Sequence, residues 1–228
     1  KHIVAAYRFE LGKVTRMEIR ERVVGLLNQV DHELATLVAK GVGVAPPEEA
    51  TANHGRSSRF LSQTVLPGEG IATRKVAVLV ADGVDAAAVE AVTAALTARG
   101  AQPEILAALD GTVATADGGS LPVTRSMTTM ASVLYDAVVV PGGEASADAV
   151  AADGFARHFI AEAYKHAKPV AATGAGRSVL TAAGLPGSAP GLVVHEGDGA
   201  PPDSFATDLI AAIAAHRHHD RDVDAIAA

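Results

Sequence analysis

Residues 168–184 have the sequence KPVAATGAGRSVLTAAG, and the rest of the chain is organised around them. Its apolar run from Pro169 to Thr173 predicts a short buried strand, the glycines that follow predict a sharp turn, and Gly184 is expected to close a helix. A strand that turns abruptly into a helix is how many α/β proteins present a nucleophile at the carboxyl edge of a sheet. Here Gly174 stands at the apex of the turn and has no side chain. The stretch therefore predicts the backbone of an active site without its reactive atom.

Around this stretch, apolar strands alternate with helices from residue 75 onward. Continuous apolar runs predict strands that are buried on both faces, which is typical of a parallel sheet. The fold class is therefore α/β, a flavodoxin-like three-layer sandwich with a parallel central sheet. Residues 216–228 are charged and are expected to be loose. Strands are expected at 75–81, 102–109, 135–140, 169–173 and 192–195, a hairpin at 111–123, and helices between Asp85 and Gly100, at 147–167, before Gly184 and from Asp203 or Ser204.

The chain before residue 75 has a different pattern. Residues 1–14 show no sustained period and are expected to be extended or irregular. Thr15 and Glu18 have the spacing of a capping box, and one apolar stripe then predicts a single helix that ends near Lys40. Residues 42–74 are rich in turn formers and polar residues, which is typical of a linker. We therefore expect a helical arm at 1–41, a linker at 42–74 and the α/β domain at 75–228.

Composition excludes several classes of function. The chain has 228 residues, no cysteine, eight aromatic residues and a formal net charge of −7, so thiolate chemistry, disulfides and nucleic-acid binding are not expected. No apolar run reaches the length of a membrane span, so no membrane partner is expected. The absence of a signal peptide favours the cytoplasm, with secretion as the alternative. Because the chain begins with Lys1 instead of methionine, we expect a fragment of a longer protein.

Four features have two interpretations each. Asp85 could act as a pocket acid, but a helix N-cap is favoured because a carboxylate there satisfies free backbone N–H groups. His195 could be a base, with a structural role favoured. The sequence His216-Arg-His-His219 could bind a metal, with a solvated surface favoured. An anion could bind near the 174–177 turn, where Arg177 would lie beside exposed N–H groups, but the tight turn needs its glycines whether or not a ligand binds.

The domain from Lys75 to about residue 215 resembles the PfpI/ThiJ branch of the class I glutamine amidotransferase-like superfamily. The motifs that carry the resemblance are ADGVD at 81–85, VVVPGG at 138–143 and the stretch at 168–184. In active members, the turn holds cysteine followed by histidine and glycine. These positions match Gly174, Ala175 and Gly176 here, and the family's pocket glutamate matches Asp85.

The resemblance thus implies a degenerate pocket, because two of three chemical side chains are missing. Gly142 and Gly143 match the backbone that would line an oxyanion hole. Thr173 and Ser178 are not expected to replace the nucleophile, since neither should point where the apex points. No catalytic, cofactor-binding or metal-binding residue is therefore assigned. The degenerate pocket consists of Asp85, Gly142, Gly143, Thr173, Gly174, Ala175 and Gly176.

A second resemblance lies at the front of the chain. The segments HIVAAYRFELGKV at 2–14, IRER at 19–22 and VDHELATLVA at 30–39 resemble the end of the helical region of haem catalases. One subgroup, the large-subunit catalases, carries a linker and a PfpI-like domain after that region. The combination implies the C-terminal portion of such a catalase. Tyr7, Tyr135 and Tyr164 match no haem-ligand motif, so the resemblance implies haem in the parent enzyme and none in this fragment.

Three functions follow as hypotheses. The first is a non-catalytic domain that supports assembly and stability of a catalase, with the catalase core domain and a homo-oligomer, expected to be a tetramer, as partners. The second is a chaperone-like holdase activity that would act on unfolded client proteins. The third is residual small-ligand binding or hydrolase or glyoxalase chemistry at the degenerate turn.

Overall fold

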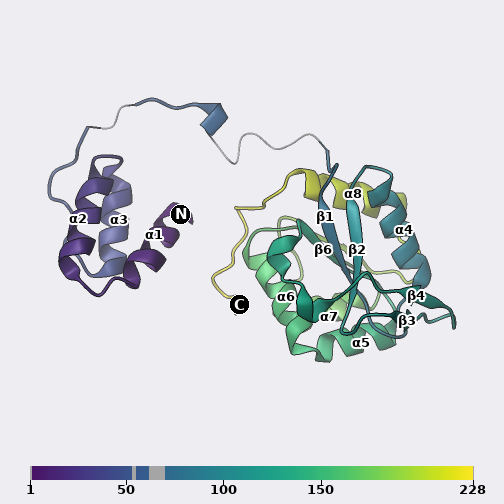
Figure 1. The fold of residues 1–228 in the computed structure, drawn as a ribbon. Helices are drawn as coiled ribbons and strands as arrows, with labels where there is room; N and C mark the ends of the chain where they lie inside the picture. The colour runs from purple at the N-terminus through teal and green to yellow at the C-terminus, as the bar shows by residue number, and fades with distance from the viewer. Residues whose placement is uncertain (1, 53–54, 62–69, 228) are drawn as a thin grey trace. The chain divides into compact units, whose positions relative to one another are not determined.

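The computed structural model describes residues 2–52, 55–61 and 70–227. The chain divides into two compact units, Lys1–Leu61 and Ser62–Ala228, and the helices and strands of each are shown in Figure 1. None of the helices in the described ranges is long and apolar enough to cross a membrane.

The first unit contains three helices, α1 (His2–Gly12), α2 (Met17–Asn28) and α3 (His32–Val42). The expectation of an irregular start is wrong, because α1 forms. Its apolar residues do not share one stripe, and it is held partly by Arg8, whose Nη2 donates to the carbonyl oxygen of Leu37 at 2.6 Å. Buried apolar residues from all three helices make the core of this unit: Leu11, Val24, Leu27, Ala35, Val38, Ala39 and Val42.

Two further expectations about this unit are wrong. The capping box at Thr15 does not form, since Arg16 is the N-cap of α2 and makes no side-chain cap bond. The single predicted helix is broken into α2 and α3 at Asp31, whose carboxylate accepts a hydrogen bond from the Leu34 N–H at 2.8 Å. An aspartate that caps a new helix ends the continuity of the apolar stripe, so the two helices pack against each other. A short 3₁₀ helix, η1 (Arg59–Leu61), follows in the predicted linker.

The second unit is the predicted α/β sandwich. Its six-stranded sheet has the order β5-β2-β1-β6-β7-β8, and every neighbouring pair is parallel. The predicted hairpin forms separately from β3 (Thr112–Ala114) and β4 (Ser120–Pro122). The sheet strands are β1 (Lys75–Leu79), β2 (Gln102–Ala107), β5 (Arg125–Ser126), β6 (Ala137–Val140), β7 (Val170–Thr173) and β8 (Leu192–His195).

Helices cover both faces of this sheet (Figure 1). On one face, α4 (Ala86–Thr97) and α8 (Asp203–Ala214) pack on the sheet, and on the other face lie α5 (Glu144–Ala152), α6 (Gly154–Lys165) and α7 (Gly176–Ala182). The single helix expected at 147–167 is wrong, because Asp153 ends α5 and caps α6 by accepting from Phe155 N–H at 2.8 Å. Two 3₁₀ turns, η2 (Met127–Thr129) and η3 (Ser132–Leu134), precede β6.

The C-terminal tail is folded onto the domain, so the expectation of a loose tail is wrong. Arg221 is only 4% exposed, and Ile226 belongs to the main apolar core. The guanidinium donates to the carbonyl oxygens of Pro190, Tyr164 and Lys168 at 2.6–2.9 Å and lies 4.1 Å from the centre of the Tyr164 ring. The tail thus joins the end of α6, the start of β7 and the segment before β8.

Lys168, the first residue of the 168–184 stretch, is also buried, with 3% exposure. Its ammonium donates to the carbonyl oxygens of Ser132 and Tyr135, each at 2.7 Å, which ties η3 to the entry of β7. Burial, aided by the positive charge of Arg217 and opposed by Asp136 and Glu162, lowers the pKa of Lys168 to about 8. The charged form is therefore less favourable in the folded protein than in the unfolded chain.

The lowered pKa predicts a rise in stability with pH. Between pH 8 and 9.5 the unfolded chain binds more protons at Lys168 than the folded protein does, so the free energy of unfolding increases with pH. From pKa values of about 8 and 10.5, the wild type should gain about 1.5 kcal/mol over Lys168→Met across this range. Urea unfolding of both proteins at several pH values measures the difference. A difference that stays constant would contradict the prediction.

Candidate functional site

The turn after β7 has the strand–turn–helix geometry that the sequence predicts. Thr173 is completely buried, and its Oγ1 accepts a hydrogen bond from the Gly142 N–H at 3.0 Å. Gly174 has a positive φ of 48°, and its N–H donates to the carbonyl oxygen of His195 at 2.9 Å. The apex therefore joins the ends of β6, β7 and β8, and the Thr173 hydroxyl is one of the contacts in this junction.

Gly176 is required by close packing. A Cβ atom at this position would lie 2.7 Å from the carbonyl oxygen of Pro141 and closer still to that of Val140. Both oxygens belong to the backbone at the end of β6, so they cannot rotate away as a side chain could. The start of α7 can reach the sheet this closely only because residue 176 has no side chain.

Gly142 and Gly143 form the loop between β6 and α5, beside Asp85. The Gly142 N–H is bonded to Thr173, and the Gly142 carbonyl accepts from the Asp85 N–H at 3.0 Å. Gly143 has a φ of 103°, and a Cβ there would lie 2.7 Å from the Asp85 backbone nitrogen. The Gly142 N–H that the family resemblance would assign to an oxyanion hole is thus already used within the protein.

Asp85 is confirmed as the N-cap of α4. Its Oδ1 accepts from the N–H groups of Ala87 and Ala88 at 3.0 and 3.2 Å. Its second oxygen, Oδ2, accepts from the Gly199 N–H at 2.6 Å. Both carboxylate oxygens are therefore occupied by backbone donors, which leaves Asp85 poorly placed to transfer a proton.

A loop lies over the apex, and the sequence pattern did not predict it. A Cβ added to Gly174 would be 2.6 Å from Asp198 Oδ1 and 3.2 Å from the carbonyl oxygen of Gly197. The place that a cysteine side chain would take is therefore in contact with the loop that follows β8. The signal available in the sequence was the acidic, glycine-rich run EGDG at 196–199, directly after a strand that ends at the same sheet edge.

The other candidate groups around the turn are engaged in local contacts. Ser178 Oγ donates to the carbonyl oxygen of Ala175 at 2.9 Å, and Arg177 Nη1 lies 3.2 Å from Glu196 Oε1. The His195 and Phe205 rings lie 6.3 Å apart, centre to centre. No nucleophile and base are brought together among these residues.

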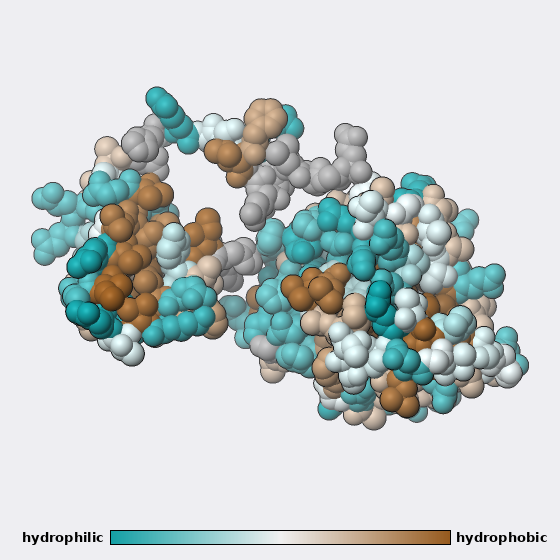
Figure 2. Space-filling model, viewed as in Figure 1, coloured by the Kyte–Doolittle hydropathy of each residue, from teal (hydrophilic) through white to brown (hydrophobic). Residues whose placement is uncertain are grey.

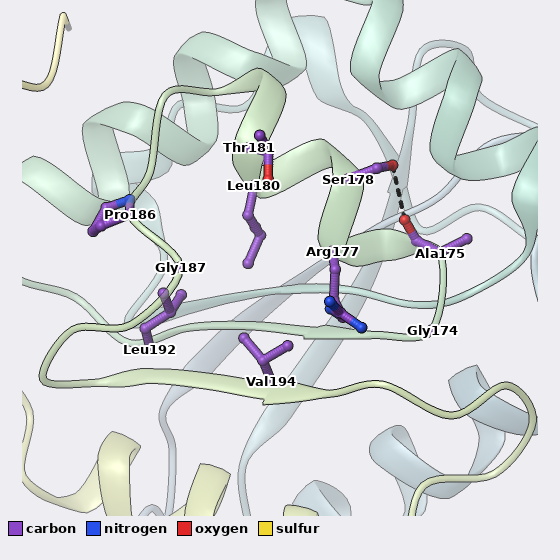
Figure 3. A pocket seen from close by; sticks show the side chains of 10 residues that line it. All are labelled: Gly174, Ala175, Arg177, Ser178, Leu180, Thr181, Pro186, Gly187, Leu192 and Val194. Atoms are coloured by element: carbon purple, nitrogen blue, oxygen red, sulfur yellow. Dashed lines mark hydrogen bonds between the residues drawn. The ribbon is translucent and has the colours of Figure 1, made fainter.

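A cavity of about 380 Å³ lies beside the turn, between α7 and β8 (Figure 3). Leu180, Leu192 and Val194 supply its apolar lining, while Arg177, Ser178 and Thr181 add polar groups. In Figure 3 the Arg177 side chain extends from α7 toward β8. The cavity is large enough for a small molecule, but its polar groups include no acid and base pair for catalysis.

The metal interpretation of the histidine run finds no support in the described ranges. No group of three or more metal-ligating side chains is assembled there. His216 Nε2 lies 3.8 Å from Asp136, whereas a ring nitrogen of His218 lies 3.1 Å from the carbonyl oxygen of Ala212. Burial lowers the pKa of both histidines. The favoured alternative, a solvated surface in a loose tail, is correct only for the exposed His219, because His216, Arg217 and His218 are half-buried.

Comparison with known proteins gives a consistent result over both units. Residues 72–222 match the family described as the C-terminal domain found in long catalases, and residues 1–42 match the family described as catalase-related immune-responsive. The chain is 45% identical to catalase HPII of Mycobacterium avium, with 100% of this chain and 34% of that protein aligned. It is 42% identical to catalase HPII of Pseudomonas putida, with 99% and 31% aligned.

Catalase-2 of Bacillus subtilis is 36% identical, and the alignment covers 97% of this chain and 32% of that protein. The chain thus spans about a third of the length of the curated relatives that it matches. The family match covers the whole α/β sandwich, including the turn at Gly174. The chain therefore belongs to the family of C-terminal domains found in long catalases.

Proposed function

We propose that this chain is a non-catalytic part of a long catalase, which decomposes hydrogen peroxide to water and oxygen, and that it supports assembly and stability of the oligomer. The observation that carries the proposal is the intact sandwich whose turn at Gly174 bears no reactive side chain and is in contact with Asp198. A domain that keeps its folded core and lacks catalytic side chains can still stabilise an oligomer through surface contacts.

The first unit supplies an apolar surface that suits a structural role. Ile3, Phe9, Leu26 and Val30 are each more than 60% exposed. Figure 2 shows a broad apolar area on the face of this unit that is turned toward the viewer. Contiguous apolar surface of this kind marks an interface. We propose that the catalase core domain or another subunit, with a tetramer as the expected assembly, covers it.

The tyrosines of this chain do not fit a haem site. Tyr135 is buried and its hydroxyl donates to Glu104 at 2.7 Å, and Tyr164 is buried beneath the Arg221 guanidinium. Tyr7 lies on α1, where its side chain is 38% exposed. To bind haem iron, Tyr135 or Tyr164 would have to break these contacts, and Tyr7 would need a surrounding pocket. We therefore propose that other residues of the long catalase bind its haem.

Removal of residues 75–228 from a long catalase that carries this chain tests the proposal. The truncated enzyme should melt at a lower temperature or form smaller oligomers, because the contacts of the sandwich are lost. Calorimetry and light scattering after size-exclusion chromatography measure the two effects, with the full-length enzyme as control. Unchanged melting and unchanged oligomer size would contradict a structural role. A holdase role would instead appear as suppressed aggregation of a heated client protein, beyond that given by an inert protein.

A further inference from the structure

The segment Glu196–Gly199 occupies the space in front of the turn at Gly174. It leaves the end of β8 and passes over the apex, so that Asp198 Oδ1 and the Gly197 carbonyl would both crowd a Cβ at position 174. The missing side chain at Gly174 and the path of this segment are therefore complementary. The turn is not simply an active site with one group removed, because part of the chain now takes the place of that group.

Three contacts hold the segment in place, and they differ in strength. The Asp85 carboxylate accepts from the Gly199 N–H at 2.6 Å, a short charge-assisted hydrogen bond of the strong kind. The Gly174 N–H donates to the carbonyl of His195, the residue of β8 that directly precedes the segment. The ion pair of Arg177 and Glu196 joins side chains that are 42% and 82% exposed, and such pairs contribute little. Asp85 is thus the principal attachment.

We propose that Glu196–Gly199 is a lid that closes the crevice at Gly174, and that Asp85 is its latch. One Asp85 oxygen caps α4 while the other holds Gly199, so a single carboxylate fixes the lid to the rigid part of the domain. Gly197 lies within the lid, and Gly199 ends it with a φ of 79°, which favours glycine. When the latch opens, the backbone at Gly174 becomes accessible beside the cavity that α7 and β8 line.

The absence of cysteine makes the lid measurable. A Gly174→Cys variant carries one thiol, placed beneath the lid, whose reaction with a disulfide reagent reports access to the crevice. The thiol should react at least about tenfold more slowly in the folded protein than in denaturant, since reactivity follows exposure. Adding Asp85→Asn should raise the rate at which the thiol reacts in the folded protein about fivefold or more. Asparagine still caps a helix, but its single side-chain oxygen cannot accept from both α4 and Gly199.

Glu196→Gln in the same Gly174→Cys background is the matched control. It removes only the exposed ion pair, so the rate should stay within about twofold. Equal rates with and without Asp85→Asn, or a thiol that reacts as fast when folded as in denaturant, would overturn the lid. Circular dichroism of each variant confirms that the fold is retained.

Because a side chain at position 174 would itself press against Asp198 and the Gly197 carbonyl, amide hydrogen exchange at Gly199 tests the lid in the natural sequence, and it decides wherever the two results differ. The wild type should protect the Gly199 N–H, and Asp85→Asn should reduce this protection about tenfold or more, because the single amide oxygen of asparagine cannot cap α4 and also accept from Gly199. Protection of β7 amides should be unchanged, which separates lid opening from general unfolding. An unprotected Gly199 in the wild type, or protection that Asp85→Asn leaves intact, would overturn the proposal.

Discussion

Replacing Gly176 with alanine should destabilise the α/β sandwich by about 3 kcal/mol or more, since overpacking against fixed backbone is among the most damaging changes. The new Cβ would lie 2.7 Å from the Pro141 carbonyl oxygen and even closer to that of Val140. To relieve the overlap, α7 would have to move away from the end of β6. That movement would disturb the packing of Val179 and Leu180 in the main core. Urea unfolding followed by circular dichroism measures the loss.

Gly187→Ala is the matched control for this prediction. Gly187 is exposed, has no positive φ, and has no atom within 4 Å of an added Cβ. Its replacement should change the free energy of unfolding by less than about 0.5 kcal/mol. Similar losses for the two variants would show that the approach of α7 to β6 is not as close as the structure describes.

Replacing Arg221 with alanine is the second change with a large expected effect, a loss of about 3 kcal/mol or more. The guanidinium satisfies carbonyl oxygens of Tyr164, Lys168 and Pro190, and it covers the Tyr164 ring. The variant would remove the guanidinium donors of the buried Lys168 and Tyr164 carbonyls, of which only that of Tyr164 keeps another donor within the described ranges, the Ala167 N–H, and it would open a gap beside the core. The tail should then detach, which proteolysis near residue 221 would detect along with a lower melting temperature.

Two variants separate the role of the guanidinium from that of charge. Arg221→Lys keeps the positive charge but cannot bond three carbonyl groups in one plane, so it should recover only part of the stability. Arg157 is exposed, and Arg157→Ala should leave stability nearly unchanged. A loss for Arg221→Ala no greater than that for Arg157→Ala would contradict the proposed role of the tail.

The sandwich could be predicted because each of its central strands can be recognised from a short run of apolar residues. The runs at Lys75–Leu79, Ala137–Val140 and Val170–Thr173 are buried on both faces, so nearly every residue in them is apolar. Several of the errors arose where a single polar residue changed the local structure. Asp31 and Asp153 each begin a new helix within an apolar helical pattern, and periodicity alone does not detect such a break. Arg221 looked like a solvated charge because its three carbonyl partners are distant in sequence.

The turn itself was predicted from residues 168–184, including the absence of a side chain at its apex, Gly174, and the requirement for glycine in a sharp turn. The cover over the apex was not predicted, because Asp198 meets Gly174 only through the path of a loop that begins after another strand. The same holds for Asp85, whose capping role is local and whose bond to Gly199 spans 114 positions. Helix capping can be inferred from a few neighbouring residues, whereas contacts of this kind depend on how the sheet edge is assembled.

We propose that the turn at Gly174 performs no chemistry. The most direct test is the turnover of p-nitrophenyl acetate and methylglyoxal by the wild type, by Asp85→Asn and by Asp198→Ala, at equal protein concentration. We predict that all three proteins give the same rate as an inert protein control. Turnover by the wild type above that background, lost in either variant while the fold is retained, would contradict the account.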